Sequence, residues 1–381
     1  MRRGTTIRAV RTHVLEARLA EPFAYSQAWY DRRGAMLVEI TTEDGITGWG
    51  EAFGPARLTA PIVQFYAPLL LGRDAMATEA IWQELYNRLR DHGQKGLPIE
   101  ALSAVDIALW DIRGKVLGEP IHRLMGGPIR TEVKAYATGL YRRAARDDHE
   151  RYLREEAARY AADGFGAMKL KTGFGVGHDI TMTRAVRSEI GAGIGLMVDA
   201  NHAYDATAAI RYGRAVEDLD IGWFEEPVPP EDLAGYREVR RALSIPVAGG
   251  EAEFTRFGFR ALLLEPRPVD ILQPDICAAG GLSECRKISD MASAFGVRCN
   301  PHVWGTGVAL AAALQWLAII PHNPPGLFPE EPMLEFDRTE HPVRQAVLTK
   351  PIEHRGSRVA IPDGPGLGIE IDRAALEHFR A

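Results

Sequence analysis

Cysteine is scarce in this sequence of 381 residues, which holds three copies and no CxxC pair. An odd number of cysteines argues against a disulfide framework and is typical of a reducing cytosol. No secretory pattern is visible at the N-terminus. The longest apolar run, residues 308–320, is interrupted by Gln315 and falls short of the roughly 20 residues that a membrane span needs. We therefore expect a cytoplasmic protein.

A strong charge of one sign is also missing. The chain has 45 lysines and arginines against 51 acids, a net charge of −6, and its arginines form no long basic run. Nothing therefore points to nucleic acid or a membrane as a partner. With 46% hydrophobic residues and no low-complexity tract, the chain can bury a large core. The partners that we expect are small molecules and further copies of the chain, as a homo-oligomer.

Three carboxylates recur at equal intervals along the chain. Asp199, Glu225 and Glu251 lie 26 residues apart, each at the end of a short apolar run. The segments between them have the apolar spacing of helices, so each run predicts a buried strand. A strand, a helix and two turns take roughly 25 to 30 residues in a parallel α/β unit, which returns successive strand ends to one face.

In a closed (β/α) barrel, that face carries the chemistry. Three acids that meet there would repel one another unless a cation lay between them. Hard oxygen ligands suit Mg²⁺ better than Zn²⁺. The trio therefore predicts a divalent metal site at a barrel mouth.

Further apolar runs bring the count of predicted strands to eight: residues 133–137, 166–171, 269–273, 297–300 and 333–336. We expect the barrel at residues 129–337. Residues 1–128 show antiparallel strands followed by helical spacing, which predicts an α+β domain. The turn-rich residues 338–381 are expected to pack back on that first domain.

Lys169 and Lys171 lie two apart on a predicted strand, so both side chains point into the barrel mouth. Two neighbouring cations lower each other's proton affinity, which makes a lysine a usable base near neutral pH. A KxK pair is more often a solvated edge. The apolar neighbours Met168 and Leu170, and the position one unit before Asp199, favour the catalytic interpretation here.

Asp275 and His302 end two later runs, 27 residues apart, and should reach the same rim. An aspartate bonded to one imidazole nitrogen fixes the tautomer and leaves the other nitrogen free for proton transfer. The lysine and histidine would then flank one substrate as two bases. Glu335 and Asn201 are candidates for substrate binding, with plain structural roles as the equal alternative.

The lysine pair, the acid trio, the Asp–His pair and the helix at residues 104–111 together resemble the enolase superfamily, in the mandelate racemase group of the mandelate racemase and muconate lactonizing enzyme family. The resemblance spans nearly the whole chain. It implies a modified (β/α)8 barrel of the (β/α)7β type, with an α+β capping domain completed by the C-terminal tail. It also implies one Mg²⁺ per active site and assembly into dimers or octamers.

The resemblance implies a reaction in which Mg²⁺ stabilises the ene-diolate formed when an α-proton leaves a carboxylate substrate. Reprotonation would give a racemase or epimerase, and loss of a β-hydroxyl an acid-sugar dehydratase. Residues 300–307, 333–338, 343–348 and 361–368 are most similar to lactone-opening members of the group. These imply opening of D-galactaro-1,4-lactone, or its glucaro isomer, to a 3-deoxy-2-keto-hexarate. The substrate's stereochemistry decides whether Lys171 or His302 removes the proton.

The resemblance also assigns substrate choice to loops of the first domain, here residues 22–33 and 53–57. Their aromatic and basic side chains, notably Tyr25 and Arg57, could form walls and carboxylate donors that suit a diacid. Trp29, Tyr30, Arg32 and Arg33 are further candidates. For any one of them, a position on the loop surface is an equal alternative. Lys169 is expected to bind substrate as well as to assist catalysis.

Overall fold

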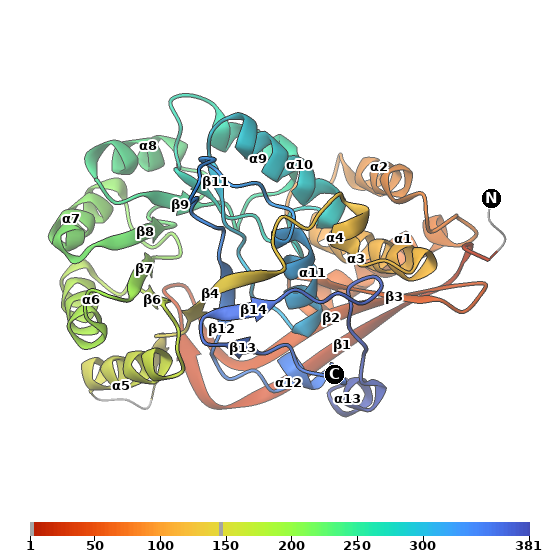
Figure 1. Cartoon of the computed structure of the whole chain (residues 1–381), viewed down its shortest axis with the longest axis horizontal. Helices are drawn as coiled ribbons and strands as arrows, with labels where there is room; N and C mark the ends of the chain where they lie inside the picture. Colours follow the sequence, from red (N-terminus) through yellow and green to blue (C-terminus); the bar gives the residue numbers. More distant parts are fainter. Residues whose placement is uncertain (1–3, 145–147) are drawn as a thin grey trace.

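The computed structural model describes residues 4–144 and 148–381 (Figure 1). The N-terminal part is an antiparallel sheet in the order β3-β2-β1-β5, with helices packed on one face. Its elements are β1 (Ile7–Ala24), β2 (Trp29–Thr42), β3 (Thr47–Ala52), α1 (Ala56–Leu70), α2 (Thr78–Leu89), α3 (Leu97–Leu117), α4 (Ile121–Leu124) and β5 (Arg142–Arg143). The predicted loop at residues 22–33 is shorter than expected, because β1 and β2 extend into it as one long hairpin.

Parallel strands form the barrel, and eight of them lie within the described residues. They are β4 (Glu132–Thr138), β6 (Ala167–Lys171), β7 (Gly195–Asp199), β8 (Ile221–Glu225), β9 (Val247–Gly249), β10 (Ile271–Leu272), β11 (Arg298–Cys299) and β12 (Leu334–Asp337). The order runs from β11 down to β6 and on to β4, and β12 pairs in parallel with β4. The predicted barrel and its strands are confirmed.

Helices alternate with these strands around the outside of the barrel (Figure 1). They are α5 (His149–Ala162), α6 (Val176–Ile190), α7 (Ala206–Val216), α8 (Leu233–Ala242), α9 (Thr255–Leu263), α10 (Gly281–Ala294) and α11 (Gly307–Leu317), with the short η1 (Glu217–Leu219) after α7. Asp148, Asp205 and Asp232 begin three of the helices, because each side chain accepts a backbone N–H of the first turn. In the described residues, each barrel strand from β4 to β11 is followed by one of the helices α5–α11 before the next barrel strand, and β12 closes the series, which confirms the (β/α)7β pattern.

The capping domain is held on the barrel by buried polar contacts between α3 and α10. The Asp106 carboxylate accepts hydrogen bonds from the Ser283 backbone N–H and hydroxyl, at 2.9 and 2.6 Å. The indole of Trp110 donates to the same hydroxyl at 2.8 Å. Burial raises the pKa of Asp106 to about 7. These contacts fix the cap over the ends of the strands that carry the candidate site.

The C-terminal segment contains α12 (Pro342–Ala346), β13 (His354–Arg355), β14 (Arg358–Ala360) and α13 (Arg373–His378). As expected, it returns to the first domain: the Glu16 N–H donates to the Phe379 carbonyl, and the Ala381 N–H donates to the Val14 carbonyl. It also contacts the barrel, because β14 pairs antiparallel with β4. No helix of the described ranges is long and apolar enough to cross a membrane.

Candidate active site

The three acids of the sequence motif meet at the carboxyl ends of neighbouring strands. Asp199 ends β7, Glu225 ends β8, and Glu251 follows β9 by two residues. Gly250 has a φ of +123°, a conformation that favours glycine, and it turns the chain so that Glu251 faces the others. One oxygen from each acid lies within 4.8 Å of the other two.

The charges of this trio are incompletely balanced by the protein. Burial works to raise the pKa of Asp199, but the ammonium groups of Lys171 and Lys169 outweigh it and hold that pKa at about 2. Burial, followed by the Glu226 carboxylate, raises the pKa of Glu251 well above its usual range. The Oε2 atom of Glu251 is buried and has no hydrogen-bond partner in the described structure. Three converging carboxylates, one with an orphaned oxygen, fit a hard divalent cation.

Both lysines of the KxK pair point into the mouth of the barrel, as the alternation of strand side chains predicts. Lys169 Nζ lies 2.6 Å from Glu225 Oε1 and 2.8 Å from Glu335 Oε1. Lys171 Nζ lies 2.5 Å from Asp199 Oδ2 and 2.9 Å from the amide oxygen of Asn201.

The expected lowering of the lysine pKa values does not occur in this structure. Burial works to lower the pKa of Lys171, and the Lys169 charge adds to that effect. The Asp199 carboxylate prevails, however, and the net direction is upward. The prediction counted the two cations and left out the acids packed around them, which outnumber the lysines.

Asp275 and His302 form a buried pair on the opposite side of the mouth. Nδ1 of His302 lies 2.7 Å from Asp275 Oδ2, and Nε2 lies 3.6 Å from Glu251 Oε2. Burial works to lower the pKa of His302, but the carboxylates of Glu251 and Glu335, together with the bond to Asp275, raise it to about 10.

A cavity of about 230 Å³ separates the lysine from the histidine, and both line it. Asn201, His202, Glu251, Ala252 and Glu335 also line it, and the rest of its wall is aromatic: Tyr25, Tyr30, Phe53, Tyr141 and Trp304. The Phe53 ring meets the imidazole edge to face at 5.4 Å. Nε1 of Trp304 is buried and has no hydrogen-bond partner among the described residues. The cavity therefore brings Lys171 and His302 together with the carboxylates of Glu251 and Glu335 inside a largely aromatic wall.

The predicted substrate-binding residues fall into two groups. Asn201, Glu335 and Tyr25 line the cavity, whereas Lys169 is fully buried and outside the described lining. Arg57 lies outside the lining, with a side chain that is 63% exposed and lies 3.8 Å from Glu16.

The other two arginine candidates are also engaged elsewhere. Arg32 binds Glu16 at 2.7 Å. Arg33 is buried behind the wall, where it stacks on Trp304 at 3.9 Å and pairs with Asp337 at 3.3 Å. The guanidinium donors proposed for a diacid are thus all outside the described lining.

Two further residues hold Glu225 and were missed from the sequence. The Trp223 indole donates to Glu225 Oε2 at 2.9 Å, and the Gln273 amide donates to the same oxygen at 2.7 Å. Trp223 precedes Glu225 by two residues on a strand, so the alternation of side chains could have found it. Tyr141 and Trp304 follow strands as loop residues, and only the fold brings them to the cavity.

The chain matches two family descriptions. Residues 7–126 match the mandelate racemase / muconate lactonizing enzyme N-terminal domain, and residues 152–375 match the enolase C-terminal domain-like family. It is 52% identical over 374 residues to the D-galactarolactone cycloisomerase of Agrobacterium fabrum, covering 98% of each chain. It is 34% identical to the arabinonate dehydratase of Saccharolobus solfataricus, over 91% of this chain and 90% of that one.

Solved structures of similar proteins have the same fold. A 3,6-anhydro-D-galactonate cycloisomerase from Zobellia galactanivorans superposes with a TM-score of 0.90 at 40% identity, covering 99% of each chain. A racemase from Streptomyces coelicolor with bound magnesium gives a TM-score of 0.86 at 29% identity, covering 98% of this chain and 100% of that one.

Proposed function

This chain belongs to the mandelate racemase / muconate lactonizing enzyme family of the enolase superfamily, and we propose that it is a Mg²⁺-dependent cycloisomerase that opens D-galactaro-1,4-lactone, or its glucaro isomer, to a 3-deoxy-2-keto-hexarate. The observation that carries the proposal is one cavity lined by Lys171, His302 and Glu251 of the acid trio, with a largely aromatic wall. The 52% identity to a D-galactarolactone cycloisomerase supports the choice of substrate.

Asp199, Glu225 and Glu251 would hold one Mg²⁺ per active site. When bound, the ion would hold the substrate carboxylate and stabilise the negative charge that develops as the α-proton leaves. The orphaned, buried oxygen of Glu251 supports this assignment. The bonds from Trp223 and Gln273 to Glu225 would orient that ligand.

Lys171 and His302 would move the protons. Because the Asp275 carboxylate lies against Nδ1, Nε2 is the nitrogen of His302 that is turned toward the acid trio. One base removes the α-proton, the electron pair forms the carbon–carbon double bond, and the ring oxygen at the β-carbon leaves as a carboxylate. That leaving group is stable as an anion and needs no acid. The enol O–H then loses its proton and the former β-carbon takes one up, which gives the 2-keto group and the 3-deoxy carbon. Lactone and product are isomers in their acid forms, and one proton is released because the new carboxylate is ionised.

The largely aromatic wall favours a lactone over an open diacid. The imidazole of His202, which also lines the cavity, is engaged by the Glu226 carboxylate at 3.1 Å. The lactone has one carboxylate and one uncharged ester, whereas the diacid has a second carboxylate that would need a cation. Burial raises the pKa of Tyr30, so its hydroxyl stays neutral. Trp304 lines the cavity, and its unpartnered Nε1 would donate to an uncharged oxygen of the ring.

An acid-sugar dehydratase is the second candidate. The 34% identity to arabinonate dehydratase favours it, and His302, with a pKa of about 10, could protonate a departing hydroxyl. Supplying the galactaro lactone and the open diacid separately, and following keto-acid formation from each, decides between the two. Keto acid from the lactone supports the cycloisomerase, and reaction of the diacid alone contradicts it.

We also propose that the protein works in the cytoplasm as a homo-oligomer. Its three cysteines are buried and free, as in a reducing compartment. Leu327 and Phe328 are 89% and 94% exposed, which fits a contact between copies. Sedimentation of the native chain beside Phe328→Ser tests the assembly, and a monomeric wild type would contradict it.

A further inference from the structure

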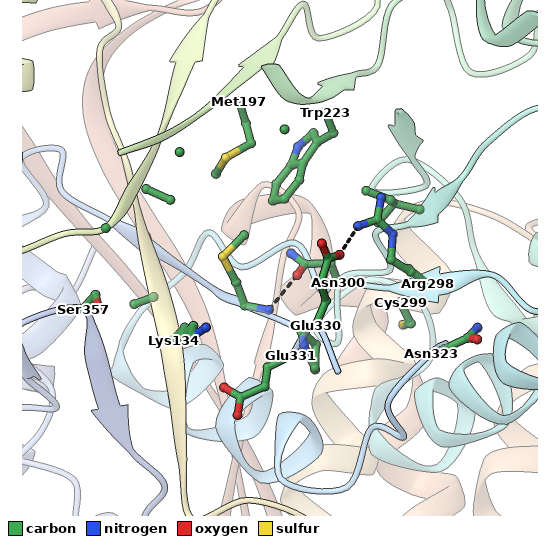
Figure 2. A pocket seen from close by; sticks show the side chains of 18 of the residues that line it. Lys134, Met197, Trp223, Arg298, Cys299, Asn300, Asn323, Glu330, Glu331 and Ser357 are labelled. Atoms are coloured by element: carbon green, nitrogen blue, oxygen red, sulfur yellow. Dashed lines mark hydrogen bonds and ion pairs between the residues drawn. The ribbon is translucent and has the colours of Figure 1, made fainter. Parts of the chain in front are cut away.

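A second, larger cavity of about 470 Å³ lies at the opposite end of the barrel, among the first residues of the strands (Figure 2). Barrel interiors are usually filled by layers of bulky side chains. Here β6, β7 and β8 contribute Ala167, Gly195 and Gly222 to the lining, which leaves space below the next layer. That layer supplies an apolar roof, the side chains of Met197 and Trp223, which point into the cavity in Figure 2.

One polar side chain in this cavity has an unused donor. Asn300 is 6% exposed, and its Oδ1 accepts the Met333 N–H at 2.7 Å. Its Nδ2 is buried and has no hydrogen-bond partner in the described structure. A buried donor without a partner has lost its bond to water and gained none in return. A ligand with an acceptor oxygen would satisfy it.

The rim carries charges of both signs. Arg298 lies 2.6 Å from Glu330. Glu331 Oε2 is buried without a hydrogen-bond partner in the described structure and lies 3.7 Å from Arg358, which pairs with a second carboxylate at 3.1 Å. Lys134 lines the same cavity and makes no ion pair with any described residue. The Lys134 ammonium and Asn300 Nδ2 are both donors of this lining, and one carboxylate or sulfonate group can accept from both.

We propose that this cavity is a second small-molecule site, which binds an amphipathic organic monoanion. The flat apolar body of the ligand lies against Trp223, Met197 and Met333. Its single carboxylate or sulfonate accepts from Asn300 Nδ2 and faces Lys134. The site is separate from the cavity that holds Lys171 and His302, since the two have no lining residue in common.

Trp223 connects this site with the acid trio. Its ring forms part of the roof of the cavity, and its Nε1 donates to Glu225 Oε2 at 2.9 Å. An occupant that shifts the ring therefore shifts a carboxylate of the trio. We expect occupancy to change the affinity for Mg²⁺, and by linkage Mg²⁺ to change the affinity for the anion by the same factor. This coupling, unlike the site itself, rests on the proposed function.

The probe for the site is 1-anilinonaphthalene-8-sulfonate, an amphipathic monoanion, titrated against the native protein and followed by its fluorescence. We expect saturable binding of one probe per chain. Asn300→Asp keeps the acceptor for Met333 but replaces the free donor by an anion, and should weaken binding at least tenfold. Gly222→Leu, where an added Cβ meets Met197 Cγ at 3.4 Å, should fill the cavity with a similar loss.

Lys350→Gln is the matched control for Lys134→Gln, because it removes the same charge from an exposed position outside the lining. Lys350→Gln should leave the affinity for the sulfonate probe unchanged, and Lys134→Gln should weaken it several-fold. Thermal unfolding confirms that each variant is folded. The uncharged N-phenyl-1-naphthylamine should still bind Asn300→Asp, which separates loss of the anion contact from collapse of the cavity.

Equal affinity of the sulfonate for wild type, Asn300→Asp and Gly222→Leu would overturn the proposal. Release of the probe at higher protein concentration would also overturn the proposal, because a second copy of the chain would then occupy the cavity. Mg²⁺ titrations with and without saturating probe test the coupling. The coupling is supported if the probe changes the Mg²⁺ affinity of wild type but not that of Trp223→Phe. It is refuted if the probe leaves the Mg²⁺ affinity of wild type unchanged. A protein that binds no Mg²⁺ in either titration would instead count against the proposed function.

Discussion

Asp275 Oδ2 lies 2.7 Å from Nδ1 of His302, and this contact fixes which imidazole nitrogen is free to move a proton. Both groups are buried, so water competes little for the bond. The imidazole is thereby held as a hydrogen-bond donor toward Asp275, with Nε2 turned to the acid trio.

Asp275→Asn should therefore lower kcat/KM by about 10² to 10⁴-fold, because an amide can hold the wrong tautomer. Steady-state kinetics with the lactone measure this, and NMR titration of His302 should show a lower pKa than in wild type. Asp270→Asn is the control, since Asp270 belongs to the same run but pairs with Arg240 at 2.7 Å. Similar losses in both variants would point to a structural effect.

Lys171→Ala and His302→Asn should each lower turnover by about 10² to 10⁴-fold, the usual contribution of general acid–base groups. The fold should survive, because neither side chain belongs to the hydrophobic core clusters. Exchange of the substrate α-proton in deuterated water identifies the base: the variant that has lost it shows no exchange. Near-normal rates in both variants would refute the assignment.

Glu251→Gln should weaken Mg²⁺ binding at least tenfold, because a neutral amide replaces one anionic oxygen. Calorimetric titration of the metal-free protein measures the change. Glu253→Gln, two residues later, removes a carboxylate that pairs with Lys95 at 2.7 Å and should leave the affinity near that of wild type. Unchanged affinity in Glu251→Gln would remove this residue from the ligand set.

Trp304→Phe removes the unpartnered indole N–H but keeps an aromatic wall. We expect kcat/KM for the lactone to fall about tenfold, the equivalent of one hydrogen bond of about 1 kcal/mol or slightly more. Phe53→Leu changes the wall without removing a donor and serves for comparison. An equal kcat/KM for Trp304→Phe and wild type would show that the indole makes no bond to substrate.

Glu39 should make the free energy of unfolding depend on pH in the acid range. The hydrogen bond from His13, assisted by Arg373, outweighs burial and lowers the pKa of Glu39 to about 2 from an unfolded value near 4.5. The carboxylate thus contributes stability that is fully present above pH 4.5 and is lost as the pH falls toward 2. Glu39→Gln should lower the free energy of unfolding at pH 7 by about 1–2 kcal/mol. Urea titrations should show that difference narrowing below pH 4.5, and a constant difference would contradict the assignment.

The spacing of the acids was sufficient to predict the barrel, because strand, helix and turn lengths are set by local geometry. The same periodicity placed Lys171 and His302 at the mouth, where the structure brings them to one cavity. The cap was harder to predict. Arg33 and Arg57 share the composition of substrate-binding arginines, yet one pairs with Asp337 and the other lies near Glu16. Ion pairs between distant segments leave no local pattern.

The electrostatics of the site also needed the fold. From two lysines alone, a lowered proton affinity was the natural expectation. The structure adds the carboxylates of Asp199, Glu225 and Glu335 at close range. These carboxylates turn the expected lowering of the lysine pKa values into a rise. Likewise, the small residues at the starts of β6 to β8 look unremarkable in sequence, and only their alignment around the barrel creates the second cavity.

The bond between β1 and the C-terminal residues has a consequence for synthesis. Phe379 and Ala381 pair with Glu16 and Val14, so the edge of the first sheet is completed by residues translated after the whole barrel. During translation, that edge stays open while the barrel units emerge one by one. The last backbone hydrogen bonds of β1 can therefore form only after residues 379–381 have left the ribosome.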